Sequence, residues 1–111
     1  SLPDSYYRDM AGDYRNRRDL LVRTLSDIGF TPYVPDGAFY MLAEFSEGRF
    51  ASATEAAETI LFKVGVATVP AQSFYRDPAD GARVLRLCFA KSMPELEEAC
   101  RRLASLKGLG L

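Results

Sequence analysis

The sequence contains no histidine and no tryptophan. Without histidine, a Ser-His-Asp triad, histidine acid–base catalysis and histidine-ligated metals are excluded for these 111 residues. Cysteine is also scarce, because Cys88 and Cys100 are too few for a metal cage or a disulfide framework. Both lie among apolar residues, so we expect two reduced, buried thiols in a cytoplasmic protein and no metal site.

Net charge and long apolar runs are lacking as well. The formal net charge is −1, so no basic field attracts nucleic acid. Arginines are frequent between positions 15 and 23, but Asp13 and Asp19 lie among them, which is typical of a solvated helix face. No apolar run reaches membrane-spanning length, and the first residues do not resemble a signal peptide. We therefore expect neither nucleic-acid nor membrane partners.

What the sequence does contain is enough apolar material for one domain spanning residues 1–111. Hydrophobic residues make up 48% of the chain, which suffices for a core at this length. Residues 1–29 predict one long helix that Gly29 ends. Its apolar residues recur at spacings of three and four: Tyr7, Met10, Tyr14, Leu21, Leu25 and Ile28. Such a helix is longer than a small sheet needs, so its first half should pack on something outside this chain.

Two extended stretches, 30–34 and 38–43, follow the helix. Pro35-Asp36-Gly37 between them predicts a hairpin turn, because proline presets φ and glycine accepts a positive φ. A second helix should begin after a capping box formed by Ser52 and Glu55, and Gly65 should end it.

The remaining residues predict two more strands and a last helix. Residues 66–69 indicate a strand stopped by Pro70, and 76–82 a turn-rich loop. Residues 84–90 are the strongest strand, and Ser92 with Glu95 caps a helix that Gly108 closes. The order is α-β-β-α-β-β-α. It predicts a two-layer α/β (α+β) domain, with a mixed or antiparallel sheet of about four strands and helices on one face.

Arg86 is the residue that physical reasoning singles out. It lies in the apolar segment 84–89, where alternation places it on one face with Val84 and Cys88. A guanidinium cannot lose its charge, so it needs an anionic or hydrogen-bonding partner. A planar fork on a rigid strand suits bidentate binding of a carboxylate. An internal ion pair, or an arginine reaching out to water, explains the same pattern, and the residues alone favour these explanations.

Other residues carry weaker signals. Gly37 is first of all a turn glycine, although a glycine also lets the backbone come close to a ligand. Ser73 and Phe74 lie in a loop after a strand, where binding residues are common. Phe39 and Tyr40 are expected to be core and cross-strand neighbours. Lysines 63, 91 and 107 all lie at or near helix ends, outside any apolar pocket that would lower their pKa for imine chemistry, so we expect no catalytic residue in this chain.

Four segments in order carry a family resemblance across nearly the whole chain. They are Tyr14-Arg15-Asn16-Arg17-Arg18-Asp19, Pro35-Asp36-Gly37-Ala38-Phe39-Tyr40, Gly65-Val66-Ala67-Thr68-Val69-Pro70 and Leu85-Arg86-Leu87-Cys88-Phe89-Ala90. Together they resemble the C-terminal small domain of the class I/II, fold-type-I, pyridoxal-phosphate-dependent aminotransferases. The 74–78 insertion and the segment around Arg86 look closest to the kynurenine/glutamine and methionine aminotransferases. Pro70-Ala71 departs from the Pro-Gly of many members.

The resemblance implies roles for particular residues. Arg86 matches the arginine that binds the α-carboxylate of the amino acid or 2-oxo acid substrate. Gly37 matches a turn glycine near the substrate, and Ser73 and Phe74 match a loop that borders the site. The imine lysine and the phosphate-binding groups of the family lie in a large domain that would precede this chain. We therefore expect pyridoxal 5'-phosphate in a full-length, homodimeric parent, and neither bound cofactor nor activity in this chain alone.

Two kinds of alternative stay open from the sequence. The same domain occurs in C–S lyases, in aminocyclopropane-carboxylate synthases and in aminotransferase-like regulators. A stand-alone α/β binding domain is a different class, and it would have its own ligand. The aminotransferase interpretation predicts an exposed apolar patch along Tyr6, Tyr7, Met10 and Tyr14, where the large domain would dock.

Overall fold

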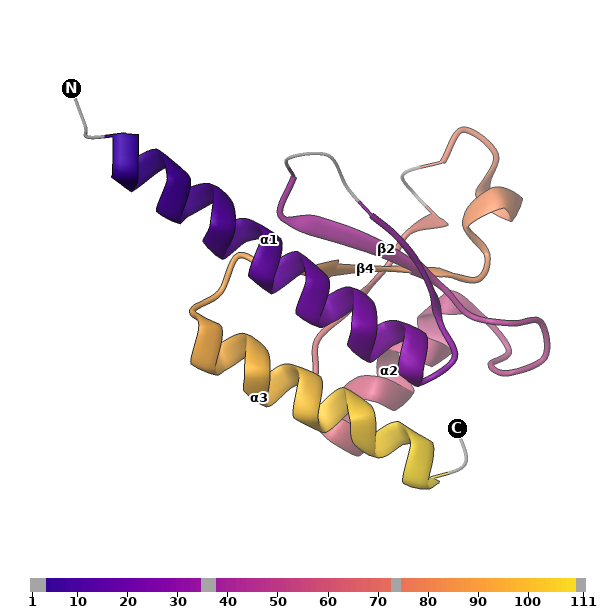
Figure 1. Cartoon of the computed structure of the whole chain (residues 1–111). Coiled ribbons are helices and arrows are strands. Elements are labelled where there is room, and N and C mark those ends of the chain that lie inside the picture. Colours follow the sequence, from indigo (N-terminus) through magenta and orange to yellow (C-terminus); the bar gives the residue numbers. More distant parts are fainter. Residues whose placement is uncertain (1–3, 35–37, 73–74, 110–111) are drawn as a thin grey trace.

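A computed structural model describes residues 4–34, 38–72 and 75–109, with side chains from residue 13 onward. Its elements follow one another along the chain as shown in Figure 1. They are α1 (Asp4–Asp27), β1 (Thr31–Tyr33), β2 (Tyr40–Glu44), α2 (Ala53–Val64), β3 (Val69–Pro70), the 3₁₀ helix η2 (Pro78–Gly81), β4 (Val84–Cys88), α3 (Met93–Ala104) and the 3₁₀ helix η3 (Ser105–Leu109).

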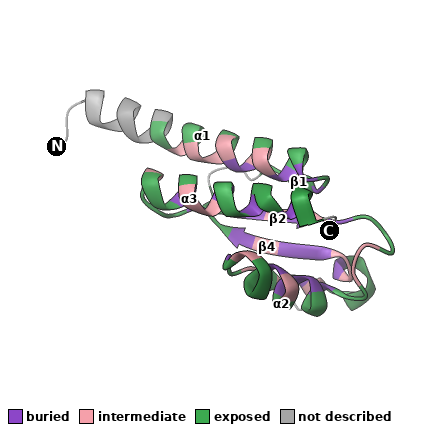
Figure 2. Ribbon diagram, turned by 90° about the horizontal axis from the view of Figure 1, so that it is seen from below, coloured by how far each residue is buried: buried purple, intermediate pink, exposed green. Residues whose placement is uncertain are grey.

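The strands form one antiparallel sheet in the order β1-β2-β4-β3. In the described ranges α1, α2 and α3 all lie on the same side of this sheet (Figures 1 and 2). Alternate strand residues point into that layer, so Met41, Ala43, Leu85 and Leu87 are buried in one core with the helix stripes. The predicted two-layer α/β fold with helices on one face is therefore confirmed, and all of its described strand pairs are antiparallel.

The caps of α2 follow the prediction from the sequence. The Ser52 side chain accepts a hydrogen bond from the Glu55 amide at 3.1 Å, and the Glu55 carboxylate accepts one from the Ala51 amide at 2.9 Å. Gly65 ends the helix with φ 74°, a left-handed conformation that glycine adopts without strain. Ser92 caps α3 in the same way, by accepting from the Glu95 amide at 3.3 Å.

Several strand limits differ from the prediction by one or two residues, and two element boundaries differ for a clear physical reason. The edge strand is Val69–Pro70 and not 66–69, because the ladder with β4 begins at Val69 and includes Pro70. An edge strand tolerates proline, since the missing amide need not face a neighbouring strand. The last helix ends at Ala104 and continues as a 3₁₀ helix through Gly108, so Gly108 does not close α3.

The long helix α1 packs on the rest of the domain from Tyr14 to its C-terminal end. Leu21 and Leu25 are buried in the core. The N-terminal half extends past the sheet and past α3 (Figure 1). The 24 residues of α1 correspond to a length of about 36 Å. The Arg17 Nε donates to the Lys91 carbonyl at 2.7 Å, which joins the middle of α1 to the segment after β4.

Candidate functional site

The face of the sheet opposite the helices, here called the open face, carries the second set of alternating strand residues. Paired residues share a face, so the register of the strands defines it. Its members are Thr31, Tyr33, Tyr40, Leu42, Glu44, Val69, Val84, Arg86 and Cys88. Tyr33, Tyr40 and Val69 are 47%, 49% and 43% exposed, whereas Met41 and Leu85 on the helix side are 0% exposed. The open face is thus the less covered side of this domain.

Arg86 lies in the middle of the open face. It pairs across the sheet with Leu42 of β2 on one side and Val69 of β3 on the other. Both neighbours are apolar, and the arginine itself is half-buried. Its guanidinium carbon lies 4.4 Å from the centroid of the Tyr40 ring. A half-buried guanidinium on an apolar strand surface can bind a carboxylate strongly, because little water competes for its N–H donors.

A second polar cluster lies at the other end of the open face. The Tyr33 hydroxyl donates to the Glu44 carboxylate at 2.8 Å, and an Arg83 nitrogen lies 4.0 Å from the same carboxylate. The Glu44 carboxylate raises the pKa of Tyr33 above its ordinary value, mainly by accepting this hydrogen bond. Glu44 of β2 pairs with Val84, two positions along β4 from Arg86, so this acid and this arginine are diagonal neighbours on the open face.

The other predicted site residues lie outside the described residues. Gly37, Ser73 and Phe74 fall in the two gaps of the structure, so their roles stay predictions. Residues next to the first gap are described. Phe39 and Tyr14 form an edge-to-face ring pair at 5.1 Å, and the Tyr14 hydroxyl donates to the Ala38 carbonyl at 2.8 Å. The chain at Ala38 and Phe39 is therefore held against α1.

Phe39 and Tyr40 were expected to be core residues and cross-strand neighbours, but they are 41% and 49% exposed. Tyr40 is a cross-strand neighbour, because it pairs with Cys88 of β4 on the open face.

Two other sequence expectations need correction. Tyr14 was expected in an exposed patch, but it is half-buried and packs on Phe39 and Phe89 of this chain. The side chains of Tyr6, Tyr7 and Met10 are outside the described set, so the rest of that patch is untested. Cys88 was expected to be buried, but it is exposed at the end of β4, whereas Cys100 is buried as predicted. Alternation along β4 was the signal that placed Cys88 on the open face.

The described lysines all lie at the surface. A binding site for pyridoxal phosphate needs a lysine in an enclosed pocket for the imine, together with groups that bind the phosphate. Lys63, Lys91 and Lys107 are all exposed, and the Lys107 ammonium lies 3.3 Å from the Asp27 carboxylate. Within the described ranges, no cluster of acids and cysteines could hold a metal ion, and no helix is both long and apolar enough to cross a membrane.

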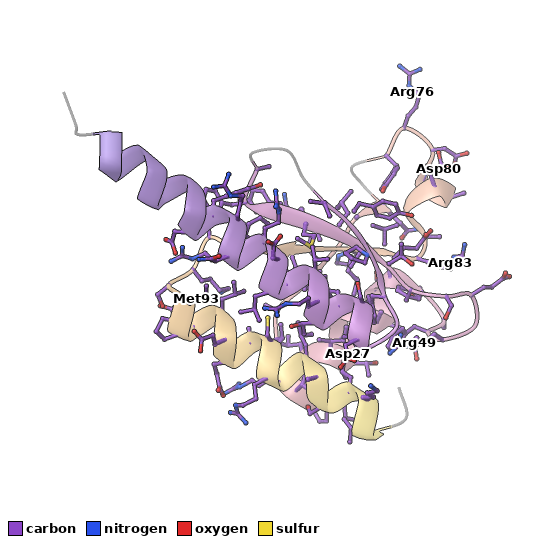
Figure 3. The ribbon with its side chains drawn as sticks, in the orientation of Figure 1. Asp27, Arg49, Arg76, Asp80, Arg83 and Met93 are labelled. Atoms are coloured by element: carbon purple, nitrogen blue, oxygen red, sulfur yellow. The ribbon has the colours of Figure 1, made fainter. Side chains whose placement is uncertain are left out.

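A groove of about 540 Å³ lies at the end of β4 next to α3. Leu87, Ala99 and Leu103 contribute to its mainly apolar wall, and Lys91 and Arg102 contribute charge. The lining includes Leu87 from the helix side of β4 and Cys88 at the end of the strand, but not Arg86, so the groove does not include the guanidinium. The charged tip of the β3–β4 connection, with Arg76 and Asp80, projects away from α1 and α3 (Figure 3).

Comparison with known proteins assigns the family. Residues 2–103 match the family described as Aminotransferase class I and II. The chain belongs to this family. The class I and II aminotransferase match covers the four motif segments together, including the strand that carries Arg86.

Individual relatives agree with the family. The LL-diaminopimelate aminotransferase of Nitratidesulfovibrio vulgaris (strain Miyazaki F) is 35% identical over 93% of this chain and 25% of its own length. The methionine aminotransferase of Escherichia coli is 30% identical over 91% of this chain and 26% of its own length. The chain thus spans about a quarter of the length of the curated relatives it matches.

Solved structures match the fold of the whole described domain. An alanine aminotransferase from Pyrococcus furiosus has a TM-score of 0.81 at 25% identity, covering 98% of this chain and 27% of its own. The N-succinyldiaminopimelate aminotransferase from Mycobacterium tuberculosis has a TM-score of 0.77 at 30% identity, covering 93% and 27%. Because relatives named for different substrates match at similar identity, the kynurenine/glutamine or methionine subgroup stays a prediction.

Proposed function

We propose that this chain is the C-terminal small domain of a pyridoxal-phosphate-dependent aminotransferase and that Arg86 binds the α-carboxylate of its substrates. Family membership and the named relatives support amino transfer over a C–S lyase, a regulator or a stand-alone binding domain. One observation carries the role of Arg86. Its guanidinium lies half-buried on the open face, between apolar neighbours, where a partner domain can bring an anion to it.

The chemistry of the substrates fits a single carboxylate-binding arginine. An L-amino acid and a 2-oxo acid differ at Cα but share the α-carboxylate, so one fork can serve both half-reactions. Two parallel N–H···O bonds also fix the rotation of the carboxylate, which a point charge does not. Arg86 thereby orients Cα relative to the rest of the active site. Pyridoxal phosphate, held by the remainder of the enzyme, would supply the electron sink.

The test replaces the fork by a point charge in the full-length enzyme. We expect Arg86→Lys to lower kcat/KM for the amino donor by a factor on the order of 10², because lysine keeps the charge but loses the bidentate geometry. Steady-state kinetics with donor and acceptor varied separately measure this factor. The loss should appear with both substrates, since both carry the α-carboxylate.

Arg101→Lys is the matched control. Arg101 lies on α3, in the helix layer, and pairs with Glu98. Its replacement by lysine makes the same chemical change away from the open face and should leave kcat/KM within about twofold. Near-normal kinetics of Arg86→Lys would remove the proposed role of Arg86.

The proposal also makes a statement about the chain on its own. Because the three lysines lie exposed, we expect the 111-residue chain to bind no pyridoxal phosphate and to have no aminotransferase activity. Absorbance spectroscopy after incubation with the cofactor and removal of the excess measures binding. A retained absorption band that hydroxylamine abolishes would contradict this expectation.

A further inference from the structure

Tyr40 is the closest described aromatic neighbour of the Arg86 guanidinium, with 4.4 Å between the guanidinium carbon and the ring centroid. We propose that Tyr40 is a positioning residue, whose ring face holds the Arg86 fork in the orientation that receives the substrate carboxylate. This inference rests on the proposed function, because it assigns Tyr40 a part in the same binding site.

The strand register puts these two side chains together. Tyr40 pairs with Cys88 and Leu42 pairs with Arg86, so Tyr40 and Arg86 are diagonal neighbours on one face of an antiparallel pair. Diagonal neighbours are within reach of aromatic and long side chains. The backbone of two sheet strands therefore fixes where the ring stands, and the flexible arginine adapts to it.

Contact with a ring face suits a guanidinium that must also bind an acid. All five N–H donors of the guanidinium point outward in its own plane, whereas the attraction to a ring acts through the ring face. A ring contact can therefore hold the cation without using up the donors that form the bidentate pair. A carboxylate in place of Tyr40 would compete with the substrate for those donors.

The residues that pair directly with Arg86 on the neighbouring strands cannot orient the guanidinium in this way. Leu42 and Val69 flank Arg86 directly but offer no ring and no acceptor on their side chains. An arginine has several rotatable bonds, and each orientation frozen on binding costs conformational entropy. A fork already held over Tyr40 loses less freedom when the substrate arrives. Tyr40 should therefore contribute to substrate affinity through Arg86 and without touching the reacting atoms.

The experiment is a double-mutant cycle in the full-length holoenzyme, with Tyr40→Leu, Arg86→Gln and the double variant, and with Tyr40→Phe as the conservative change. We expect Tyr40→Leu to raise KM for the amino donor by roughly 3- to 30-fold, the range of a cation–ring contact, with kcat changed less. Tyr40→Phe keeps the ring and should stay within about twofold of the original KM. In the Arg86→Gln background, Tyr40→Leu should have little further effect.

Tyr33→Leu controls for the general loss of an aromatic ring from the open face. Tyr33 lies on β1, two strands from Arg86, so its replacement by leucine should leave KM within about twofold of the original value. Circular dichroism and thermal unfolding of each holoenzyme verify that the variants are folded.

The outcomes separate the two proposals. An unchanged KM for the Arg86→Gln variant would contradict both the proposed role of Arg86 and this inference. A raised KM for Arg86→Gln together with a normal KM for Tyr40→Leu would contradict the inference alone. So would a Tyr40→Phe variant as impaired as Tyr40→Leu, or a double variant whose effects simply multiply, because either result assigns Tyr40 a role that is independent of the guanidinium.

Discussion

A single cation in an apolar strand has two physical explanations, and the residues around Arg86 alone could not separate them. Alternation along 84–89 placed the side chain on the face shared with Val84 and Cys88, and the sheet register agrees with that placement. What the sequence could not predict is the partner from another strand. Tyr40 was expected to be a cross-strand neighbour, but the contact of its ring with the guanidinium depends on a diagonal register that only the folded sheet defines.

Gly81 is a residue at which one added methyl group should destabilise the fold. A Cβ there would lie 2.6 Å from a ring carbon of Tyr75 and 2.8 Å from the Cα of Gln72. The second neighbour is backbone, so the clash cannot be relieved by a side-chain rotation alone. We expect Gly81→Ala to lower the free energy of unfolding by about 1–3 kcal/mol, the usual cost of overpacking. Urea denaturation followed by circular dichroism measures it.

The control for Gly81 is another glycine in a 3₁₀ helix. A Cβ at Gly108 would meet nothing within 4 Å, and Gly108 is exposed. Gly108→Ala should therefore change the free energy of unfolding by no more than about 0.5 kcal/mol in the destabilising direction. Equal midpoints for the two variants would show that the segment around Tyr75 moves aside to accept the methyl group.

At the scale of elements, the sequence predicted the helices better than the strands. Capping residues act within one turn of the chain, so Ser52, Gly65 and Ser92 identify their helix ends locally. Strand limits depend on a partner that is distant in sequence. Residues 66–68 carry a strand pattern, but the ladder with β4 begins only at Val69. The end of α3 was mispredicted for a related reason, since the chain tightens into a 3₁₀ helix before reaching Gly108.

The α2 cap offers a test at the same scale. Ser52 satisfies the Glu55 amide, which has no partner inside the helix because it lies in the first turn. We expect Ser52→Ala to lower the free energy of unfolding by about 1 kcal/mol, and Ser52→Asp to restore most of this loss, because aspartate also accepts at an N-cap. Urea unfolding of the three proteins measures the difference.

Thr54→Ala is the matched control for the cap. Thr54 is exposed within α2, two residues after the cap, and alanine is a better helix former. This variant should be as stable as the original or slightly more stable. If Ser52→Ala had the same free energy of unfolding as Thr54→Ala, the hydrogen bond to the Glu55 amide would make no measurable contribution to stability.

At the scale of the whole molecule, the two sides of the sheet differ in what covers them. The helix layer buries one face in a continuous core, whereas the open face keeps Tyr33, Tyr40 and Val69 more than 40% exposed. Exposed apolar residues are typical of surfaces that meet another domain, and α2 carries them as well, since Leu61 and Phe62 are 55% and 87% exposed. The chain matches only about a quarter of each relative's length. A further domain that covers the open face is therefore part of the proposed function, and it needs a test of its own.

The reactivity of the two cysteine thiols can test whether a further domain covers the open face, because one thiol is exposed and the other is buried. Cys88 is exposed at the edge of the open face, and Cys100 is 5% exposed in the core, where burial raises the pKa of its thiol. Only the thiolate attacks a disulfide reagent, so burial slows Cys100 by restricting access and by favouring the protonated thiol. In this chain alone we expect one thiol to react quickly with a chromogenic disulfide and the other only as the chain unfolds.

The same measurement on the full-length enzyme tests how the domains are arranged. If the remaining domain covers the open face, Cys88 should react at least about tenfold more slowly there than in the 111-residue chain, because labelling then requires the domains to separate. Cys88→Ser and Cys100→Ser variants assign each phase to its thiol. An equal Cys88 rate in both proteins would mean that this end of the open face stays in contact with solvent, and the remaining domain would then have to approach Arg86 from the other end of β4, where Val84 pairs with Glu44.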